Sequence, residues 1–158
     1  MRISTLALIF SSLFSLSSFA ESSPAEYCVK QGGSLVDFVM LDQRRQPTQI
    51  KKVLCVFQIE NEGWKNVAPE TLANPGQSLA VNFFRNPVKL GPSKGAASPA
   101  YGYCTKTLKG LYATWRSLAS GDESGTCTFA DGSMISDWAL VYGAQRLPKF
   151  DSKFSFQK

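Results

Sequence analysis

The sequence predicts an α+β fold made of two small disulfide-clipped modules that can pack as one compact domain. The chain has four cysteines, and it carries a similar motif twice, SPAEYC at residues 23–28 and SPAYGYC at residues 98–104. Each motif is followed by a strand-like run with a second cysteine, VLCVF and then GTCTF, and by a glycine and a tryptophan. We interpret this shared order as a diverged internal duplication. Each module is expected to have a short helix, a β-hairpin-like pair of strands and a short C-terminal helix or turn.

Residues 1–20 have the pattern of a cleaved signal peptide. Arg2 is followed by an apolar, Ser-rich run that ends in Ser18-Phe19-Ala20, the small-residue pattern that signal peptidase accepts. The run is shorter than the ~20 residues that a membrane-spanning helix needs. We therefore expect an exported protein, periplasmic or secreted.

Module 1 is predicted to span residues 21–85. Ser23 and Glu26 form a capping-box pattern around Pro24, which predicts a short helix that runs to about Gln31 and stops at two glycines. Runs of β-branched and aromatic residues then predict strands at 34–41 and 50–59, and a further one at 78–84.

A linker rich in Pro, Gly and Ser is predicted at residues 86–97, followed by module 2 at residues 98–146. In module 2, Pro99 opens a helix that ends at Gly110. Strands are predicted at 111–118 and 126–130, with a turn-rich loop at 119–125 between them. A short helix with Ser136 as its N-cap follows and ends at Gly143.

The last segment, residues 147–158, is an aromatic and basic tail. Phe150, Phe154 and Phe156 alternate with Lys or Ser, which favours a terminal strand packed on the domain. The alternative is an exposed tail that contacts lipid or a partner.

Cysteine usage is the strongest clue to how the modules are held together. An even number of cysteines in an exported chain indicates disulfides, and four cysteines allow three connectivities. The repeat selects Cys28–Cys55 and Cys104–Cys127, each expected to stabilise its module by ~3–4 kcal/mol. Tyr and Trp side chains from both modules are expected to pack around these bonds: Tyr27, Trp64, Tyr103 and Trp138.

Two segments, SPAEYCVKQGGSL and CTFADGSMISDWALVYG, resemble the start and end of a small bacterial extracytoplasmic module. That family is catalogued as a domain of unknown function and is labelled as a haemolysin. The matching positions are Pro24, Ala25, Tyr27, Cys28, Gly32 and Gly33 in the first copy, and Cys127, Asp131, Gly132, Asp137 and Trp138 in the second. Ser23 and Ser98 depart from the usual Asn. Because family members are mostly single modules, the alternative to duplication is one module split by a long insertion. The resemblance carries no established activity.

The charge pattern argues against a nucleic-acid partner. The formal net charge is +5, and the basic residues are scattered along the chain rather than gathered with aromatic residues. We expect a solvated basic surface, or weak attraction to an anionic membrane surface or glycan.

Catalytic machinery is not apparent in the sequence. The chain has no histidine, which excludes Ser-His-Asp and Cys-His systems. Paired cysteines leave no thiolate or zinc site. The carboxylates that stand near one another in sequence look like loop charges: Glu60, Glu62, Asp122, Glu123, Asp131 and Asp137. We predict no enzyme, no metal site and no cofactor.

The expected function is therefore that of a small exported binding protein of the bacterial envelope or extracellular space. Its partner would be a protein or a glycan, and the candidate binding residues are Tyr27, Trp64, Tyr103 and Trp138, since Trp and Tyr dominate binding hot spots. The alternative is a membrane-active, haemolysin-like protein that acts through its positive charge and its Phe/Lys tail.

Overall fold

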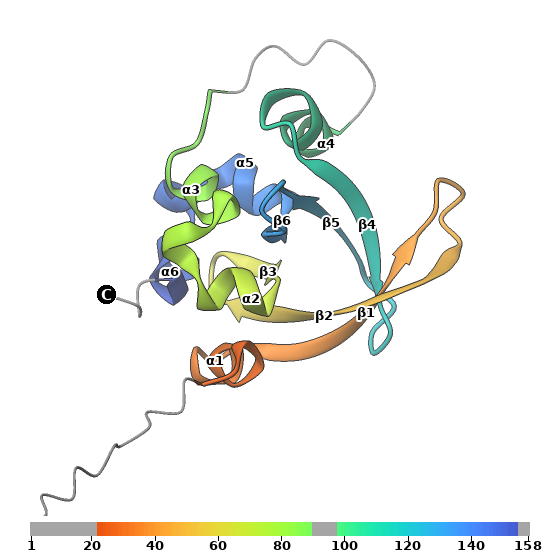
Figure 1. The fold of residues 1–158 in the computed structure, drawn as a ribbon, viewed down its shortest axis with the longest axis horizontal. Helices are drawn as coiled ribbons and strands as arrows, with labels where there is room; N and C mark the ends of the chain where they lie inside the picture. Colours follow the sequence, from red (N-terminus) through yellow and green to blue (C-terminus); the bar gives the residue numbers. More distant parts are fainter. Residues whose placement is uncertain (1–21, 90–97, 155–158) are drawn as a thin grey trace, which may run out of the picture.

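The computed structural model describes residues 22–89 and 98–154. These residues form a closed antiparallel barrel of six strands in the order β1-β2-β3-β6-β5-β4, with helices on its outer surface (Figure 1). Helix and strand are mixed, as the predicted α+β class requires. The predicted signal peptide, residues 90–97 of the predicted linker and the last four residues lie outside the described part of the chain.

The two halves of the chain have the same order of elements. The first half contains α1 (Pro24–Lys30), β1 (Ser34–Leu41), β2 (Pro47–Ile59), β3 (Gly63–Val67) and α2 (Pro69–Ala73). The second half contains α4 (Pro99–Gly102), the π-helical turn η2 (Tyr103–Thr107), β4 (Leu111–Ser117), β5 (Glu123–Thr128), β6 (Met134–Ser136) and α5 (Asp137–Arg146). Between the halves lie η1 (Pro75–Gln77) and α3 (Leu79–Arg85), and the chain continues after α5 with α6 (Pro148–Asp151) and η3 (Ser152–Phe154).

Strand register also agrees between the halves. In the first half, Leu35 of β1 lies opposite Cys55 of β2; in the second, Tyr112 of β4 lies opposite Cys127 of β5. The second cysteine of each half is in turn paired with the third strand. Positions in one half can therefore be assigned to positions in the other by register.

Equivalent positions meet where the halves join. At one seam, Val67 of β3 lies opposite Ile135 of β6. Within its own half, Val67 is paired with Cys55, and Ile135 is paired with Cys127. At the other seam, Val39 of β1 lies opposite Arg116 of β4, each four residues beyond the position that faces a cysteine. The barrel is thus closed by two antiparallel contacts that relate the halves symmetrically.

Both predicted disulfide pairings are present. Cys28 of α1 is bonded to Cys55 of β2, and Cys104 of η2 is bonded to Cys127 of β5. All four cysteines are fully buried. In each half, the bond attaches the first helical segment to the second strand on the outside of the barrel.

One glycine in each half makes room for its disulfide. A Cβ atom on Gly33 or on Gly110 would overlap the sulfur atoms of the neighbouring bond. These glycines stand at equivalent places, directly before β1 and β4. The residue before each has a positive φ, 77° at Gly32 and 59° at Lys109, so the chain makes the same left-handed turn between helix and strand in both halves.

Apolar side chains form two clusters. One fills the barrel: Phe38, Leu54, Val56, Ala68, Trp115 and Met134. The other lies between the barrel and the helices and contains both disulfides together with Phe57, Leu72, Phe84, Leu140, Phe150 and Phe154. Helices α2, α3, α5 and α6 therefore cover the outer side of the barrel, while the β1–β2 hairpin extends away from them (Figure 1).

The first predicted helix begins as its sequence indicates. Ser23 accepts a hydrogen bond from the backbone N–H of Glu26, and the Glu26 carboxylate accepts one from the backbone N–H of Ser23. This is a complete capping box. In the second half, Pro99 again opens a helix, but the helix changes to a π-helical turn at Tyr103.

The structure differs from the prediction in three respects. Each half has a third strand, β3 or β6, where only a hairpin-like pair is expected. Residues 78–84 form the helix α3 rather than a strand, because Ser78 caps the N–H of Val81 and the buried residues follow a helical spacing. The described residues of the tail form the helical turns α6 and η3 rather than a strand.

The described part of the tail, residues 147–154, is also not an exposed aromatic surface. Phe150 and Phe154 are buried in the outer cluster, with Phe150 in edge contact with Phe57. The Glu62 carboxylate accepts the backbone N–H groups of Lys149 and Phe150, which fixes the start of α6. Phe156 lies outside the described residues.

Candidate functional site

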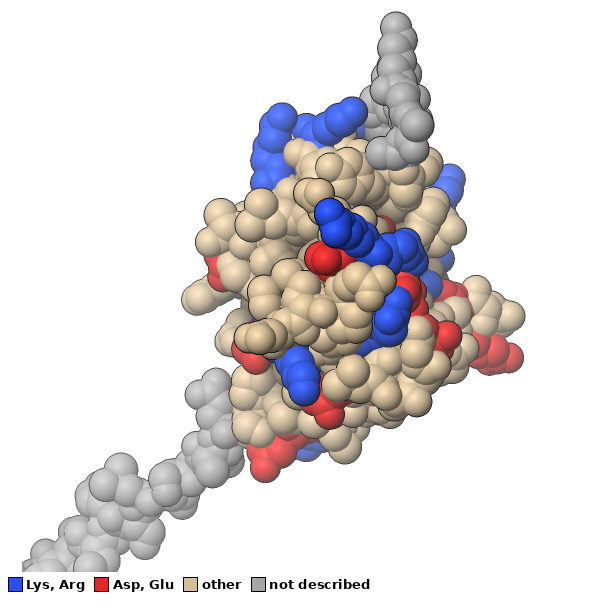
Figure 2. Space-filling model, turned by 90° about the vertical axis from the view of Figure 1, so that its right-hand side faces the viewer, with Lys and Arg blue, Asp and Glu red and all other residues tan. Residues whose placement is uncertain are grey.

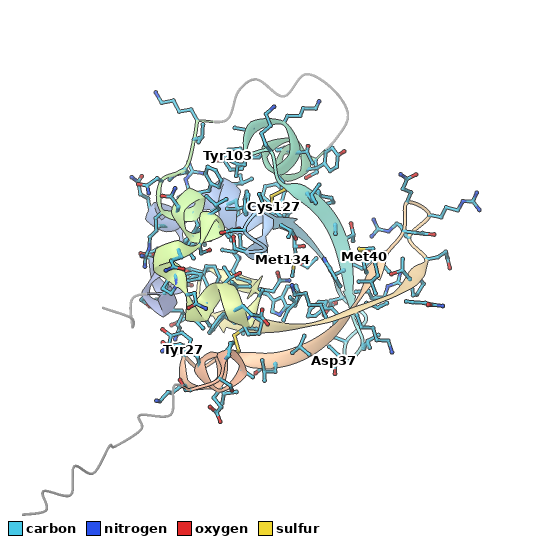
Figure 3. The ribbon with its side chains drawn as sticks, in the orientation of Figure 1. Tyr27, Asp37, Met40, Tyr103, Cys127 and Met134 are labelled. Atoms are coloured by element: carbon cyan, nitrogen blue, oxygen red, sulfur yellow. A yellow bond between two sulfur atoms is a disulfide. The ribbon has the colours of Figure 1, made fainter. Side chains whose placement is uncertain are left out.

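Two of the four predicted binding residues are buried. Figure 3 shows Tyr27 beside α1 and Tyr103 beside α4, and both belong to the outer cluster around the disulfides. The Tyr103 hydroxyl donates to the backbone carbonyl of Val88 at 2.9 Å, and burial raises the pKa of both phenols. These tyrosines pack as expected around the disulfides, but they offer no surface to a partner.

The two tryptophans lie in different settings. Trp64 of β3 is half-buried and packs against Phe38, 6.0 Å between ring centroids, in the barrel cluster. Trp138 of α5 is 42% exposed and stacks on Tyr142, with centroids 5.6 Å apart. The two tryptophans are not equivalent by strand register. Val67 and Ile135 are equivalent positions that pair with each other, and Trp64 precedes Val67 whereas Trp138 follows Ile135. Their matching in the sequence repeat is therefore wrong.

Asp137 is the most unusual polar residue near Trp138. It is the first residue of α5 and only 4% exposed. Its Oδ1 accepts the backbone N–H of Trp138 at 2.7 Å. Burial raises the pKa of its carboxyl, and hydrogen bonds from the Trp138 and Asp137 backbone N–H groups oppose that rise only in part.

The Asp137 carboxylate shares its location with the Tyr112 hydroxyl. A Cβ atom on Gly125 would overlap both groups, so they lie side by side over the Gly125 backbone, and only a glycine leaves space for them. Burial raises the pKa of Tyr112, a hydrogen bond with Thr114 lowers it, and the negative charge of Asp137 raises it further. The two groups therefore interact electrostatically.

Three further aromatic residues are connected to this pair. Tyr101 of α4 packs edge-on against Tyr112 with ring centroids 5.0 Å apart, and Tyr101 is 39% exposed. On the α5 side, Trp138 directly follows Asp137 in the chain, and Tyr142 stacks on Trp138. We call these five residues, Tyr101, Tyr112, Asp137, Trp138 and Tyr142, the Asp137 site.

The basic groups nearby are already paired. Arg45, in the β1–β2 turn, is the cation whose charge lowers the pKa of Tyr112, and it forms an ion pair with Glu123. Glu123 also binds Arg116 at 2.8 Å. Among the described residues, no Lys or Arg forms an ion pair with Asp137. Figure 2 shows basic and acidic side chains interspersed over the face that it presents, which agrees with the scattered charge in the sequence.

The equivalent place in the first half is an apolar groove. Counted back from the first cysteine of each half, Ala25 corresponds to Tyr101. Relative to the second cysteine, Leu35 corresponds to Tyr112 and Val53 to Gly125. Counted on from the β3–β6 seam, Pro69 corresponds to Asp137. All four first-half residues line one cavity of about 460 Å³. We call it the Leu35 groove. The same scaffold thus carries an acidic, aromatic site in one half and an apolar groove in the other.

Two of the other carboxylates singled out in the sequence, Asp131 and Glu62, hold elements of the fold together. Asp131 accepts the backbone N–H of Leu79 at 2.7 Å and hydrogen bonds from Ser133, which outweigh desolvation and lower its pKa. It thereby ties the β5–β6 turn to the start of α3. Glu62 fixes the start of α6. Within residues 22–89 and 98–154, no group of three or more His, Cys, Asp or Glu residues is placed to hold a metal ion.

Comparison with known proteins finds a family match in the second half. Residues 95–144 match the family described as "Domain of unknown function (DUF333)". This stretch contains all five residues of the Asp137 site, whereas the Leu35 groove lies outside it. Neither a curated protein nor a solved structure matches the chain. No helix among the described residues combines the length and the apolar character that a membrane span needs.

Sequence reasoning missed Tyr101, Tyr112 and Tyr142 as site residues. Tyr101 is the extra aromatic residue within the second motif, SPAYGYC, and this difference from SPAEYC is the signal that could have found it. Tyr112 carries no comparable signal, because only the folded chain brings it beside Asp137. Tyr142 stands four residues after Trp138 in the predicted short helix, and this spacing is the signal that could have found it.

Proposed function

We propose that this chain is an exported, non-enzymatic binding protein of the bacterial envelope or extracellular space, and that it contacts a protein or glycan partner through the Asp137 site. Two disulfides are typical of exported proteins and support this location. The lack of histidine and the pairing of all four cysteines leave neither an imidazole nor a thiolate for catalysis.

The exposed stacked pair of Trp138 and Tyr142 carries the proposal. Each ring keeps about two fifths of its surface open, 42% and 39%, although an aromatic ring gains free energy when it is buried. Tyr101 adds a third exposed ring from a neighbouring helix. Large aromatic side chains held rigidly at a surface are the residues that most often dominate binding energy.

We also propose that the two halves descend from one duplicated module, with the boundaries predicted from the sequence. The shared order of elements, the matching register and the two equivalent glycines support this origin. A single module split by an insertion would not require the second half to repeat the register of the first. After duplication, one copy would be free to keep the Asp137 site while the other changed.

We do not propose the membrane-active alternative. The tail phenylalanines that motivated it, Phe150 and Phe154, are buried between the helices and the barrel. Deleting the tail would therefore damage the fold rather than remove a lipid-binding surface.

Binding to isolated envelope fractions tests the proposed function. Oxidised protein lacking residues 1–20 is incubated with membrane-protein and peptidoglycan fractions, and the bound amount is measured against concentration. We expect saturable binding that the double variant Trp138→Ala, Tyr142→Ala weakens by at least about tenfold. The matched control is Ile50→Ala with Leu118→Ala, because these apolar side chains are also exposed but lie away from α5. Equal loss in both variants, or binding that does not saturate, would contradict the proposal.

A further inference from the structure

We propose that the Asp137 site takes the basic side chain, lysine or arginine, of a protein partner. This inference rests on the proposed function and adds the chemistry of the group that is recognised. Its basis is a buried carboxylate that has no cationic partner among the described residues and lies beside the Tyr112 phenol, with the exposed Tyr101 packed on that phenol.

The carboxylate is the first part of the argument. Asp137 is only 4% exposed. No side chain of the described residues donates a hydrogen bond to its carboxylate or forms an ion pair with it. Its hydrogen bonds come from backbone N–H groups at the start of α5. A buried carboxylate is costly unless it is paired, so a cation from outside would relieve that cost.

The aromatic rings are the second part. The faces of Tyr and Trp rings attract ammonium and guanidinium groups, most strongly where water is excluded. Tyr101 of α4 is exposed and packs edge-on against Tyr112, whose hydroxyl lies beside the carboxylate, and the exposed Trp138 is the next residue after Asp137. Carboxylate and rings together form the usual surroundings of a bound organic cation.

Access to the carboxylate decides between possible cations. A carboxylate that is almost fully buried can be reached by a slender chain with a charged tip, which lysine and arginine provide. The ring of an amino sugar is too bulky to approach it closely. A divalent metal ion prefers several oxygen ligands, and the described residues place no cluster of three acidic or other metal-binding side chains.

The groups around Asp137 set how binding depends on pH. The Tyr112 hydroxyl lies beside the carboxylate, and Thr114, Tyr101 and Arg45 act on that hydroxyl. Arg45 is itself paired with Glu123. Burial raises the pKa of Asp137, so the carboxylate loses its charge at a higher pH than an exposed aspartate does. Affinity for a cation should accordingly fall as the pH is lowered through this pKa.

A peptide titration followed by NMR tests the inference on the oxidised chain without residues 1–20. The probes are acetyl-Gly-Lys-Gly-amide, its arginine version, its norleucine version and glucosamine. We expect saturable shifts at the Trp138 amide and indole with the lysine and arginine peptides, at one site per chain, and at least about tenfold weaker binding of norleucine.

Two substitutions distinguish the effect of the Asp137 charge on peptide binding from the effect of the protein's overall charge. Asp137→Asn keeps the acceptor for the Trp138 N–H but removes the charge, and it should weaken lysine binding by at least about tenfold. Asp37→Asn removes an exposed carboxylate of β1 and should leave the affinity within about twofold. If Asp137→Asn does not fold, the wild-type affinity between pH 7 and pH 4 decides, and it should fall as the pH falls.

Three results would overturn the inference: norleucine binds as well as lysine, Asp137→Asn binds as well as the wild type, or glucosamine binds more tightly than the peptides. Its failure is distinguishable from failure of the proposed function. If Trp138 and Tyr142 support envelope binding while no cationic probe binds, the proposed function stands and the basic side chain is excluded.

Discussion

The Leu35 groove and the Asp137 site occupy equivalent places on the two halves of one barrel. Strand register and disulfide position are the same at both, so equivalent backbone positions lie between the first helical segment and the second strand in each half. The side chains make the difference. Pro69 and Val53 leave an apolar groove, whereas Asp137 and Gly125 create a buried carboxylate. The comparison shows that four positions decide the chemistry of a place that the fold itself determines.

Removal of each disulfide in turn tests whether the halves are held in the same way. We expect Cys28→Ser with Cys55→Ser, and separately Cys104→Ser with Cys127→Ser, each to lower the free energy of unfolding by about 2–5 kcal/mol. Both bonds close loops of similar length, with sequence separations of 27 and 23. Denaturant unfolding measures the effect. A loss below about 1 kcal/mol for either pair would break the equivalence.

Substitution at the two equivalent second-strand positions should have unequal effects. Gly125→Ala forces a methyl group into the Asp137 carboxylate and the Tyr112 hydroxyl, which should cost about 1–3 kcal/mol of stability. Val53→Ala changes an exposed side chain of the Leu35 groove and should cost about 0.5 kcal/mol or less. Denaturant unfolding of both variants makes the comparison, and equal costs would contradict the packing described at Gly125.

Glu62 attaches the segment after α5 to the first half. Glu62→Ala leaves two backbone N–H groups of α6 without their acceptor and should cost about 1 kcal/mol. Glu60→Ala is the matched control, because its ion pair with Lys149 is exposed and should be worth at most about 0.5 kcal/mol. If thermal unfolding shows the same small shift for both variants, the Glu62 contact does not hold α6.

The last comparison is between the stability of the wild type and that of Asp137→Asn at different pH values. Burial raises the pKa of Asp137 in the folded protein, so its protonated form is favoured there, and this contribution to stability is lost as the pH rises through that pKa. Asp137→Asn has no such loss. The stability of the variant relative to the wild type should therefore increase between acidic and neutral pH, measured by denaturant unfolding at each pH. A constant difference would contradict the raised pKa.

Local features of the fold were predictable from the sequence, whereas its closure was not. The repeat led to both disulfide pairings, and Ser23 with Glu26 predicted the first capping box. The third strands were missed because β6 has only three residues, Met134–Ser136, too few for an alternating pattern. Residues 78–84 have a strand-like composition, and only their cap and their contacts with α5 make them helical. The pairing of Val67 with Ile135 joins residues that are distant in the sequence, so no local sequence pattern predicts that the barrel closes there.

The candidate site was predictable only in part. Trp138 was found because tryptophan is typical of binding surfaces, and it is indeed exposed. Tyr27 and Tyr103 each stand directly before the cysteine of their motif, and both were predicted to bind a partner. Both pack instead against the disulfides. The sequence does not show which face of a short helix is covered. Asp137 stood among the acidic residues of the motif, but its burial depends on Gly125 of a different strand.

The ionisation of Asp137 tests the central claim most directly. Carbon-detected NMR of the oxidised wild-type chain, titrated from pH 7 to pH 2.5, follows the carboxyl carbon of each aspartate. We expect the pKa of Asp137 to lie above the ordinary aspartate value of 3.8 because the carboxyl is buried, and the pKa of Asp131 to lie below it. A pKa for Asp137 at or below 3.8 would show that its carboxylate is solvated or already paired, and would contradict the site described for the second half.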